Sequence, residues 1–208
     1  MTQSAESRRP IAARSSGWAQ RAASMLARAG VAPNAVSLAS VPFALIGAGL
    51  LLIWPTVAGL VGCAACVQAR LVCNLLDGMI AVEGGKKTAL GPLHNEFPDR
   101  IADSLFIVAL GYAAGAPALG WFGALAAALT AYVRAFGGAL GLGQDFRGPM
   151  AKQHRMAAMT FGCLLGAVEL PLTGSRHALL ATSALIALGS LATCVNRTLA
   201  IARRLRAR

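Results

Sequence analysis

Acidic side chains are scarce in this chain of 208 residues, and most of them gather in one stretch. The chain has eight acids, and five of them fall between positions 77 and 103: Asp77, Glu83, Glu96, Asp99 and Asp103. The residues around them are mostly apolar or basic. A carboxylate beside apolar segments is costly unless it is paired or binds a cation. This stretch is therefore the first candidate for a functional site.

Two sets of polar residues in and beside this stretch recur at intervals of three or four, as neighbours on one helix face do. The first set is Arg70, Asn74 and Asp77, and the second is Asn95, Asp99 and Asp103. Folding the two helices against each other through a loop at residues 84–87 would bring these faces together. The predicted oxygen ligands are Asn74, Asp77, Asn95 and Asp99, with Glu96 and Asp103 as auxiliary acids. Oxygen ligands favour a hard cation, so the pattern predicts a site for Mg²⁺ or Mn²⁺.

The same residues resemble the signature of the CDP-alcohol phosphatidyltransferase family. That signature reads D-x-x-D-G-x-x-A-R, eight or nine residues, and then G-x-x-x-D-x-x-x-D. This chain reads Asn74-x-x-Asp77-Gly78-x-x-Ala81-Val82, eight residues, and then Gly91-x-x-x-Asn95-x-x-x-Asp99. The spacing matches throughout, and the motif lies between the second and third of six apolar segments, in agreement with the family's architecture.

The resemblance implies a phospholipid-synthesis enzyme. Such an enzyme transfers a substituted phosphoryl group from a CDP-linked donor, such as CDP-diacylglycerol, to an alcohol, and releases CMP. It implies metal-site roles for Asn74, Asp77, Asn95 and Asp99, with Asp99 also the catalytic base for the acceptor hydroxyl. The implied donor-binding positions are Gly78, Ala81 and Gly91, of which the glycines let a bulky ligand approach the backbone. Bound Mg²⁺ or Mn²⁺ would neutralise the donor phosphates.

Three positions depart from the signature. Two family aspartates are Asn74 and Asn95, and the family arginine is Val82. An asparagine oxygen can bind a metal, but each replacement removes a full negative charge, so we expect weaker metal affinity and one ion rather than two. Glu83, Glu96 or Asp103 would restore charge. The alternative for Glu83 and Glu96 is that they are solvated loop acids paired with Lys86, Lys87 or Arg100. The departures also leave open a family member that has lost catalysis and binds lipid or nucleotide.

A second, basic group accompanies the acids. Arg134 lies within an apolar segment, whereas Lys152 and Arg155 open the next one. They are similar to the family's arginine and Gly-x-x-Lys/Arg stretch that help to hold an acceptor phosphate, which Arg binds bidentately and Lys binds as a point charge. The alternative for Lys152 and Arg155 is that they only anchor a helix on the cytoplasmic side.

The elements that must position these residues are membrane helices. The chain is 56% hydrophobic and 13% charged, whereas soluble domains carry about 25% charged residues. Six apolar segments approach the length of about 20 residues that a span needs: 38–54, 57–82, 98–114, 119–142, 153–172 and 176–201. We therefore predict an all-α integral membrane bundle of six transmembrane helices.

An amphipathic interfacial helix is predicted before the first span, over residues 17–29. Trp18, Met25 and Leu26 lie on its apolar side, and Arg21 and Arg28 on its polar side. The alternative is a helix packed on the protein's own cytoplasmic end. This division gives a cytoplasmic N-terminal segment, residues 1–37, and a six-helix transferase domain, residues 38–208.

Loop charges predict the orientation. Most Lys and Arg residues fall in the N-terminal segment, residues 86–87, residues 147–155 and the C-terminal tail, whereas the alternate connections carry one charge or none. The positive-inside rule then places both termini in the cytoplasm. The N-terminal segment lacks the small-residue cleavage site of a signal peptide. The Ala-, Gly- and Arg-rich composition suggests a bacterial cytoplasmic membrane.

The net charge of +11 could suggest nucleic-acid binding. However, the basic residues separate apolar segments and form no stripe with interleaved aromatics, so membrane lipids are the predicted counter-charge and no nucleic-acid partner is expected. The five cysteines lie in apolar runs and are interpreted as packing residues. The other expected partners are CDP-diacylglycerol or a related CDP-alcohol, the acceptor and a second copy of the chain, since homodimers are common in the family. A small transporter is the remaining alternative.

Overall fold

A computed structural model describes residues 16–83 and 90–208, which form seven α-helices and no strand. The helices are α1 (Gly17–Arg28), α2 (Pro33–Ile53), α3 (Val57–Glu83), α4 (Gly91–Ala113), α5 (Pro117–Ala139), α6 (Lys152–Thr173) and α7 (His177–Arg206). The loop expected at residues 84–87 lies outside the described residues. The predicted all-helical class is confirmed.

Five of the described helices, α2, α3, α5, α6 and α7, are long and apolar enough to cross a membrane. This confirms the prediction of a membrane helical bundle. Helix α4 is also long, but the part from its start to Asp103 carries Glu96, Asp99, Arg100 and Asp103. The apolar remainder of α4 is shorter than the roughly 20 residues that a span needs. A sixth span therefore stays a prediction.

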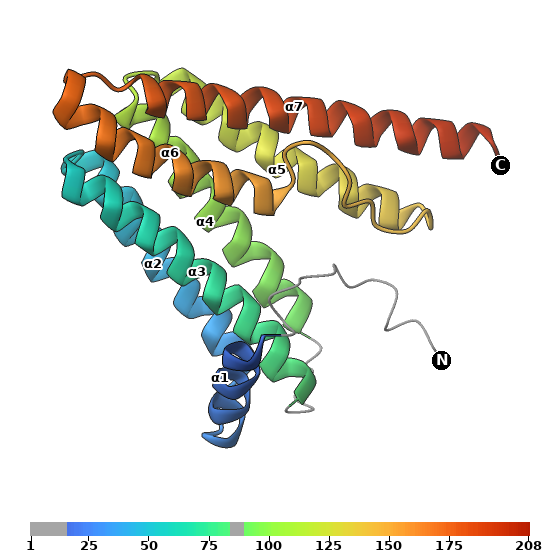
Figure 1. Ribbon diagram of the computed structural model, residues 1–208. Helices are drawn as coiled ribbons and strands as arrows, with labels where there is room; N and C mark the ends of the chain where they lie inside the picture. The colour runs from blue at the N-terminus through green and yellow to red at the C-terminus, as the bar shows by residue number, and fades with distance from the viewer. Residues whose placement is uncertain (1–15, 84–89) are drawn as a thin grey trace.

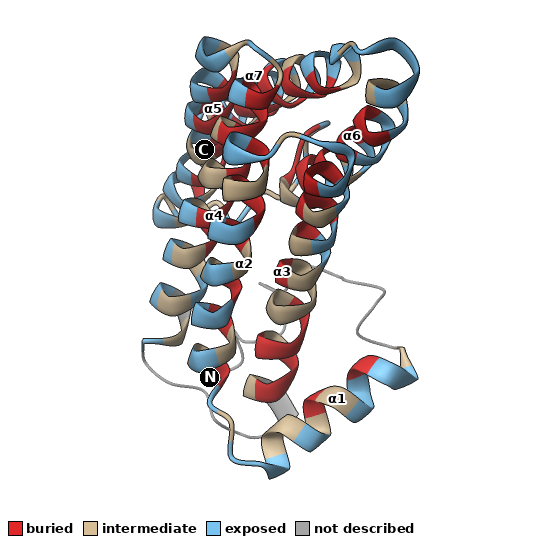
Figure 2. Ribbon diagram, turned by 90° about the vertical axis from the view of Figure 1, so that its left-hand side faces the viewer, coloured by how far each residue is buried: buried red, intermediate tan, exposed pale blue. Residues whose placement is uncertain are grey.

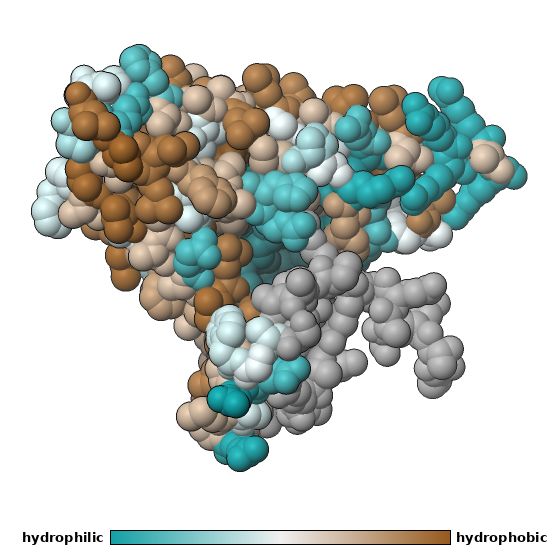
Figure 3. Space-filling view, viewed as in Figure 1, coloured by the Kyte–Doolittle hydropathy of each residue, from teal (hydrophilic) through white to brown (hydrophobic). Residues whose placement is uncertain are grey.

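The long helices form two arms that join at one end and diverge at the other (Figure 1). One arm contains α2, α3 and α4, and the other contains α5, α6 and α7. Helix α4 packs against both α2 and α5, and α6 packs against both α3 and α7, so these contacts join the arms. Hydrophilic residues gather where the arms diverge, whereas apolar residues dominate the joined end (Figure 3). Polar groups on α3, α4 and α6 are thereby brought to one hollow.

Burial follows the faces of the helices, with buried positions turned inward (Figure 2). The largest buried cluster contains residues of every helix from α2 through α7. It includes Phe106, Ile107, Leu110 and Met159, each fully buried. Large apolar side chains also cover the outside, among them Leu45, Ile53, Trp121, Phe161 and Leu188. Such an apolar exterior is costly in water and suits contact with lipid.

Helices α4 and α5 approach so closely that glycine is needed on both sides. A Cβ added at Gly120 would lie 2.9 Å from the Gly111 Cα and 2.9 Å from the Val108 carbonyl oxygen. Both atoms belong to backbone, which cannot move aside as a flexible side chain can. Small residues at such crossings let membrane helices pack by direct van der Waals contact.

We expect Gly120→Ala to lower the thermal midpoint of the purified protein, with a loss of about 1–3 kcal/mol from overpacking. Gly49→Ala is the matched control, because a Cβ there meets nothing within 4 Å and alanine favours the helix. Equal midpoints for the two variants in a detergent thermal-shift measurement would contradict this account of the α4–α5 contact.

Helix α1 matches the predicted N-terminal helix, and it packs on the end of α3. Ala19 and Ala23 are fully buried in a cluster with Leu75, Leu76, Met79 and Ile80 of α3. Trp18 and Met25 are exposed, while Leu26 is partly buried against the cluster. The packed side therefore centres on the two alanines, as expected for the alternative of packing on the protein itself. The interfacial position of Trp18 and Met25 stays a prediction.

Candidate functional site

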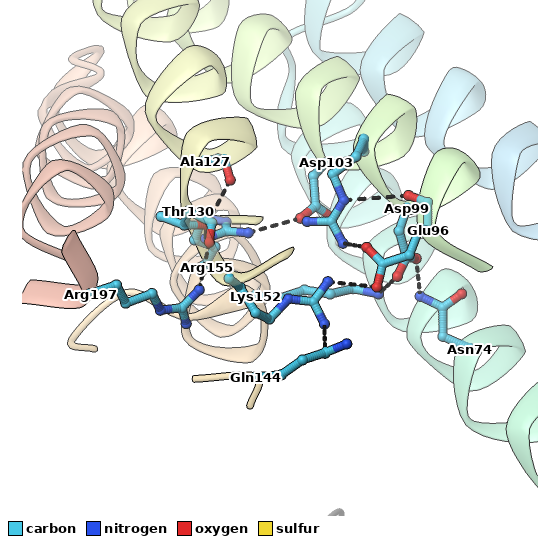
Figure 4. Close-up of polar contacts among 12 residues, drawn as sticks. Asn74, Glu96, Asp99, Asp103, Ala127, Thr130, Gln144, Lys152, Arg155 and Arg197 are labelled. Carbon is cyan, nitrogen blue, oxygen red and sulfur yellow. Dashed lines mark hydrogen bonds and ion pairs between the residues drawn. The ribbon is translucent and has the colours of Figure 1, made fainter. Parts of the chain in front are cut away.

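Asp99 lies at the centre of a polar cluster formed by α3, α4 and α6 (Figure 4). Its Oδ1 accepts hydrogen bonds from Arg70 Nη2 and Asn74 Nδ2, each at 2.9 Å. Its Oδ2 accepts one from the Lys152 ammonium group. Arg70 and Asn74 are one turn apart on α3, and Lys152 is the first residue of α6. Both carboxylate oxygens of Asp99 are thus held by donors, two of them cationic.

A second carboxylate, Asp103, lies one turn deeper on α4. It pairs with Arg70 at 2.8 Å and with Arg155 at 3.2 Å. The Arg155 guanidinium also donates to the Met150 carbonyl at 2.8 Å and to Thr130 Oγ1 at 3.3 Å. Arg155 is only 1% exposed, so it lies beneath the hollow, where it ties α4, α5 and α6 together. This places Arg155 behind the surface on which an acceptor phosphate was expected.

The remaining predicted metal ligands, Asp77 and Asn95, differ in their burial and contacts. Asp77 is buried on the same face of α3 as Asn74, and its Oδ2 accepts a hydrogen bond from Ser37 Oγ of α2 at 2.5 Å. Asn95 is exposed and makes no hydrogen bond or ion pair with any other described residue. Asn74 and Asp99 are therefore brought together as predicted, whereas Asn95 does not join them in this arrangement.

The three predicted donor-binding positions lie at the cytoplasm-facing ends predicted for α3 and α4. Gly78 and Ala81 follow Asp77 on α3, and Gly91 opens α4. All three are partly accessible, neither buried in the core nor fully exposed. A ligand could thus approach the backbone beside Asp77.

Arg134 of α5 belongs to a separate, neighbouring group. Its guanidinium donates to Glu96 at 2.6 Å and to Gln144 at 3.0 Å, and Glu96 also pairs with Arg100 at 3.1 Å. These residues line a pocket of about 350 Å³ together with Tyr132 and small residues of α5. Burial disfavours the charge of Glu96, but the two arginines outweigh it and hold its pKa below the usual range. Glu96 is therefore paired with two arginines, Arg134 and Arg100.

The connection between α5 and α6 is fixed to α7, which the sequence alone did not indicate. Arg197 of α7 donates to the Arg147 carbonyl at 2.8 Å and to the Thr130 carbonyl at 2.7 Å. In the same connection, the side-chain hydrogen bond from Arg147 lowers the pKa of Asp145 to about 2. Arg197 could have been found as a basic residue in an apolar segment, the signal that drew attention to Arg134.

Arg70 and Ser37 are further residues of the site to which the family motif assigns no role. Arg70 is fully buried and contacts both Asp99 and Asp103. Its place in an apolar segment, one turn before Asn74, was a usable signal. Ser37 offers no such signal, because its contact with Asp77 is formed only by packing α2 on α3.

No family model matches the chain, and no curated protein matches it. Solved structures of Mycobacterium tuberculosis phosphatidylinositol phosphate synthase do match, at 23% sequence identity. The structure with CDP-DAG bound matches with a TM-score of 0.72 over 88% of this chain and 92% of that one. The chain has the fold of this synthase.

Two further structures of the same synthase agree. The complex with manganese and citrate also gives a TM-score of 0.72, over 88% of each chain. The apo form gives 0.67, over 86% of this chain and 93% of that one. The match extends over almost the whole length of both proteins, so the likeness covers the entire helical bundle rather than one helix pair.

The manganese complex of that neighbour raises the question of whether the present residues fit a divalent ion. Two of the four predicted ligands are neutral amides, and Asn95 is turned to the surface. Asn74 presents its NH₂ group, not its oxygen, to Asp99. Asp99 is already neutralised by Arg70 and Lys152. Among the described residues, no three His, Cys, Asp or Glu side chains form a group that could hold a metal. As arranged, the residues do not fit a divalent ion.

Proposed function

We propose that this protein is a CDP-alcohol phosphatidyltransferase-type membrane enzyme that uses Asp99 as its catalytic base. The observation that carries the proposal is a carboxylate held among cations in a hydrophilic hollow. The motif spacing from Asn74 to Asp99 supports it, as does the shared fold with a synthase solved with CDP-DAG bound. The donor would be CDP-diacylglycerol or a related CDP-alcohol, used in phospholipid biosynthesis.

The proposed reaction is one displacement at phosphorus. The acceptor hydroxyl oxygen attacks the donor phosphorus that carries the lipid, and its proton passes to Asp99. The bond from that phosphorus to the bridging oxygen breaks, and CMP leaves with the electron pair. A carboxylate acts as such a base only when an oxygen is free, so Asp99 must first release one of its hydrogen-bond donors.

The other predicted site residues have separate proposed roles, according to where they lie. Gly78, Ala81 and Gly91 would border the donor, and Arg134 would hold a phosphate of the acceptor in the neighbouring pocket. Arg155 is a positioning residue for Asp103 and the start of α6. We also propose that the site faces the cytoplasm of a bacterial cell, with both termini on that side, and that the chain forms a homodimer.

A divalent ion is the one part of the expected chemistry that this site supports poorly. The family resemblance and the neighbour's manganese complex make Mg²⁺ and Mn²⁺ the ions to test. When bound, such an ion would supply charge neutralisation to the donor phosphates. Because Asp99 is already paired with Arg70 and Lys152, the proposed reaction does not use a divalent ion.

A second function is favoured by the two asparagines and by the engaged state of Asp99. If Asp99 never loses its donors, the protein would bind a CDP-lipid without turning it over. Such a protein would be a binding member of the same family, not an enzyme.

The experiment that decides between the enzyme and the binding protein measures CMP release from CDP-diacylglycerol by the purified protein. It is run with Mg²⁺, with Mn²⁺ and with EDTA, and with a panel of alcohol acceptors. We expect acceptor-dependent CMP release, because the proposed base, Asp99, lies beside a hydrophilic hollow and cationic groups that suit the donor phosphates. Binding of the CDP-lipid without release would favour the binding function. Neither binding nor release across a panel of CDP-alcohols would refute the proposal.

A further inference from the structure

Lys152 occupies an unusual place for a residue expected to hold an acceptor phosphate. Its ammonium group contacts Asp99, whereas Arg134 lies in the neighbouring group with Glu96 and Gln144. The Lys152 side chain is 20% exposed, in contrast to the fully buried Arg70 on the other side of Asp99. Lys152 is thus the accessible cation of the cluster, next to the residue proposed as base.

Charges in the cluster are balanced without a metal. Three buried acids, Asp77, Asp99 and Asp103, stand against three cations, Arg70, Lys152 and Arg155. Relative to a site with aspartate at positions 74 and 95, this one has two fewer negative charges, which is the charge that one divalent ion would neutralise. Adding such an ion here would leave an excess of positive charge among buried groups, which is costly.

The same charges suit an anion. Arg70 is fully buried, and its Nε and Nη1 have no hydrogen-bond partner among the described residues, so the hydrogen-bond donor capacity of the cluster is not fully used. The N-terminus of α6 adds to it, because Ala151 makes no side-chain cap and the first turn contains no acid. Free backbone N–H groups at a helix start and the helix dipole both favour a phosphate.

We propose that Lys152 and the adjoining start of α6 bind the donor pyrophosphate directly and do so in place of a divalent ion. This inference rests on the proposed function, and it identifies Lys152 and the start of α6 as the groups that neutralise the negative charge of the donor pyrophosphate. The flexible side chain of Lys152 can turn from Asp99 to a phosphate oxygen, while buried Arg70 remains on Asp99. The turn frees Oδ2 of Asp99, so that donor binding itself exposes the base.

The test is equilibrium binding of CDP-diacylglycerol to the full chain in detergent, with EDTA or with millimolar Mg²⁺. We expect the wild-type dissociation constant to agree within about twofold between the two conditions. Lys152→Gln should weaken binding at least about tenfold in EDTA, since a hydrogen bond to a charged group is lost, and Mg²⁺ should not restore it. Lys152→Arg keeps the charge and should bind within a few-fold of wild type, which separates the charge from a folding defect.

A direct metal readout completes the test. Free Mn²⁺ gives a strong electron paramagnetic resonance signal that is lost on binding. We expect the wild-type protein with CDP-diacylglycerol to leave Mn²⁺ free, and the double variant Asn74→Asp, Asn95→Asp to bind it.

The outcomes separate the two proposals. Wild-type binding that disappears in EDTA, or Mn²⁺ bound by the wild type at the CDP-lipid site, would overturn the role of Lys152 and leave the proposed function standing. Unchanged binding by Lys152→Gln would overturn it as well. No binding of the CDP-lipid in either condition would overturn the proposed function, and this inference with it.

Discussion

Replacing Asp99 by asparagine is expected to abolish CMP release while the donor still binds. Asparagine keeps the size of the side chain but cannot accept the proton of the acceptor hydroxyl, and a positioned base contributes about 10²–10⁴-fold to a rate. The variant also removes the charge that holds Lys152, so the ammonium group is free to meet the donor phosphates. We therefore expect CDP-diacylglycerol to bind at least as tightly as it does to the wild type.

The two readouts together distinguish catalysis from folding. A variant that only unfolds would lose both binding and release, whereas loss of release alone identifies the base. Glu169→Gln is the matched control, because Glu169 lies 17 residues along α6 from Lys152, or about 25 Å in a helix. Its Oε1 accepts a hydrogen bond from His177 N and its Oε2 accepts one from Ala178 N, and glutamine keeps one acceptor oxygen for them. CMP release by Asp99→Asn at a rate close to that of the control would show that the base is another group.

How much of this site is readable in the sequence depends on the kind of contact. Asn74 and Asp99 could be paired in advance because their positions follow from helical spacing and from a motif. The long apolar segments gave the order of the helices, and α2, α3 and α5 to α7 begin and end close to the predicted limits. These features are local, or repeat along one helix, so the sequence carries them.

The contacts that give the site its charge balance are not local. Lys152 reaches Asp99 across 53 positions, and Ser37 reaches Asp77 across 40. Each depends on how two helices are rotated against each other, which helical spacing does not specify. The same reason explains Arg155: its position at the start of an apolar segment fits either phosphate binding or a membrane-surface anchor, and only the packing of α4, α5 and α6 shows it to be buried.

Asn95 shows that a motif position does not guarantee the expected contact. Its motif position predicts a ligand on the face shared with Asp99, but the side chain is exposed. Four residues cover slightly more than one helical turn, so a side chain one turn nearer the helix start can lie beyond the edge of the cluster. Its loss of charge relative to the motif also removes the attraction that would draw it toward a cation. The motif spacing therefore does not by itself bring Asn95 to Asp99, and the metal-ligand set stays a prediction.

The buried arginine should carry the largest share of the stability of this region. Arg70 is 0% exposed and bridges Asp99 and Asp103, and removing one partner of a buried ion pair costs about 3–5 kcal/mol because the remaining charge stays buried. Arg70→Met keeps much of the side-chain volume and removes the charge. We expect its thermal midpoint to fall by at least about 6 °C, taking about 2 °C per kcal/mol for a chain of this size.

The matched control is Arg100→Met, in which another arginine of the same region is also replaced by methionine. Arg100 pairs with Glu96 four residues earlier on α4, and the two side chains are 26% and 44% exposed. Exposed pairs of this kind contribute less than about 1 kcal/mol, so the midpoint should shift little. If both variants lost the same few degrees in a detergent thermal-shift measurement, the buried bridge would not be stabilising α3 against α4. In that case the charges of Asp99 and Asp103 would have to be compensated from α6 alone, through Lys152 and Arg155.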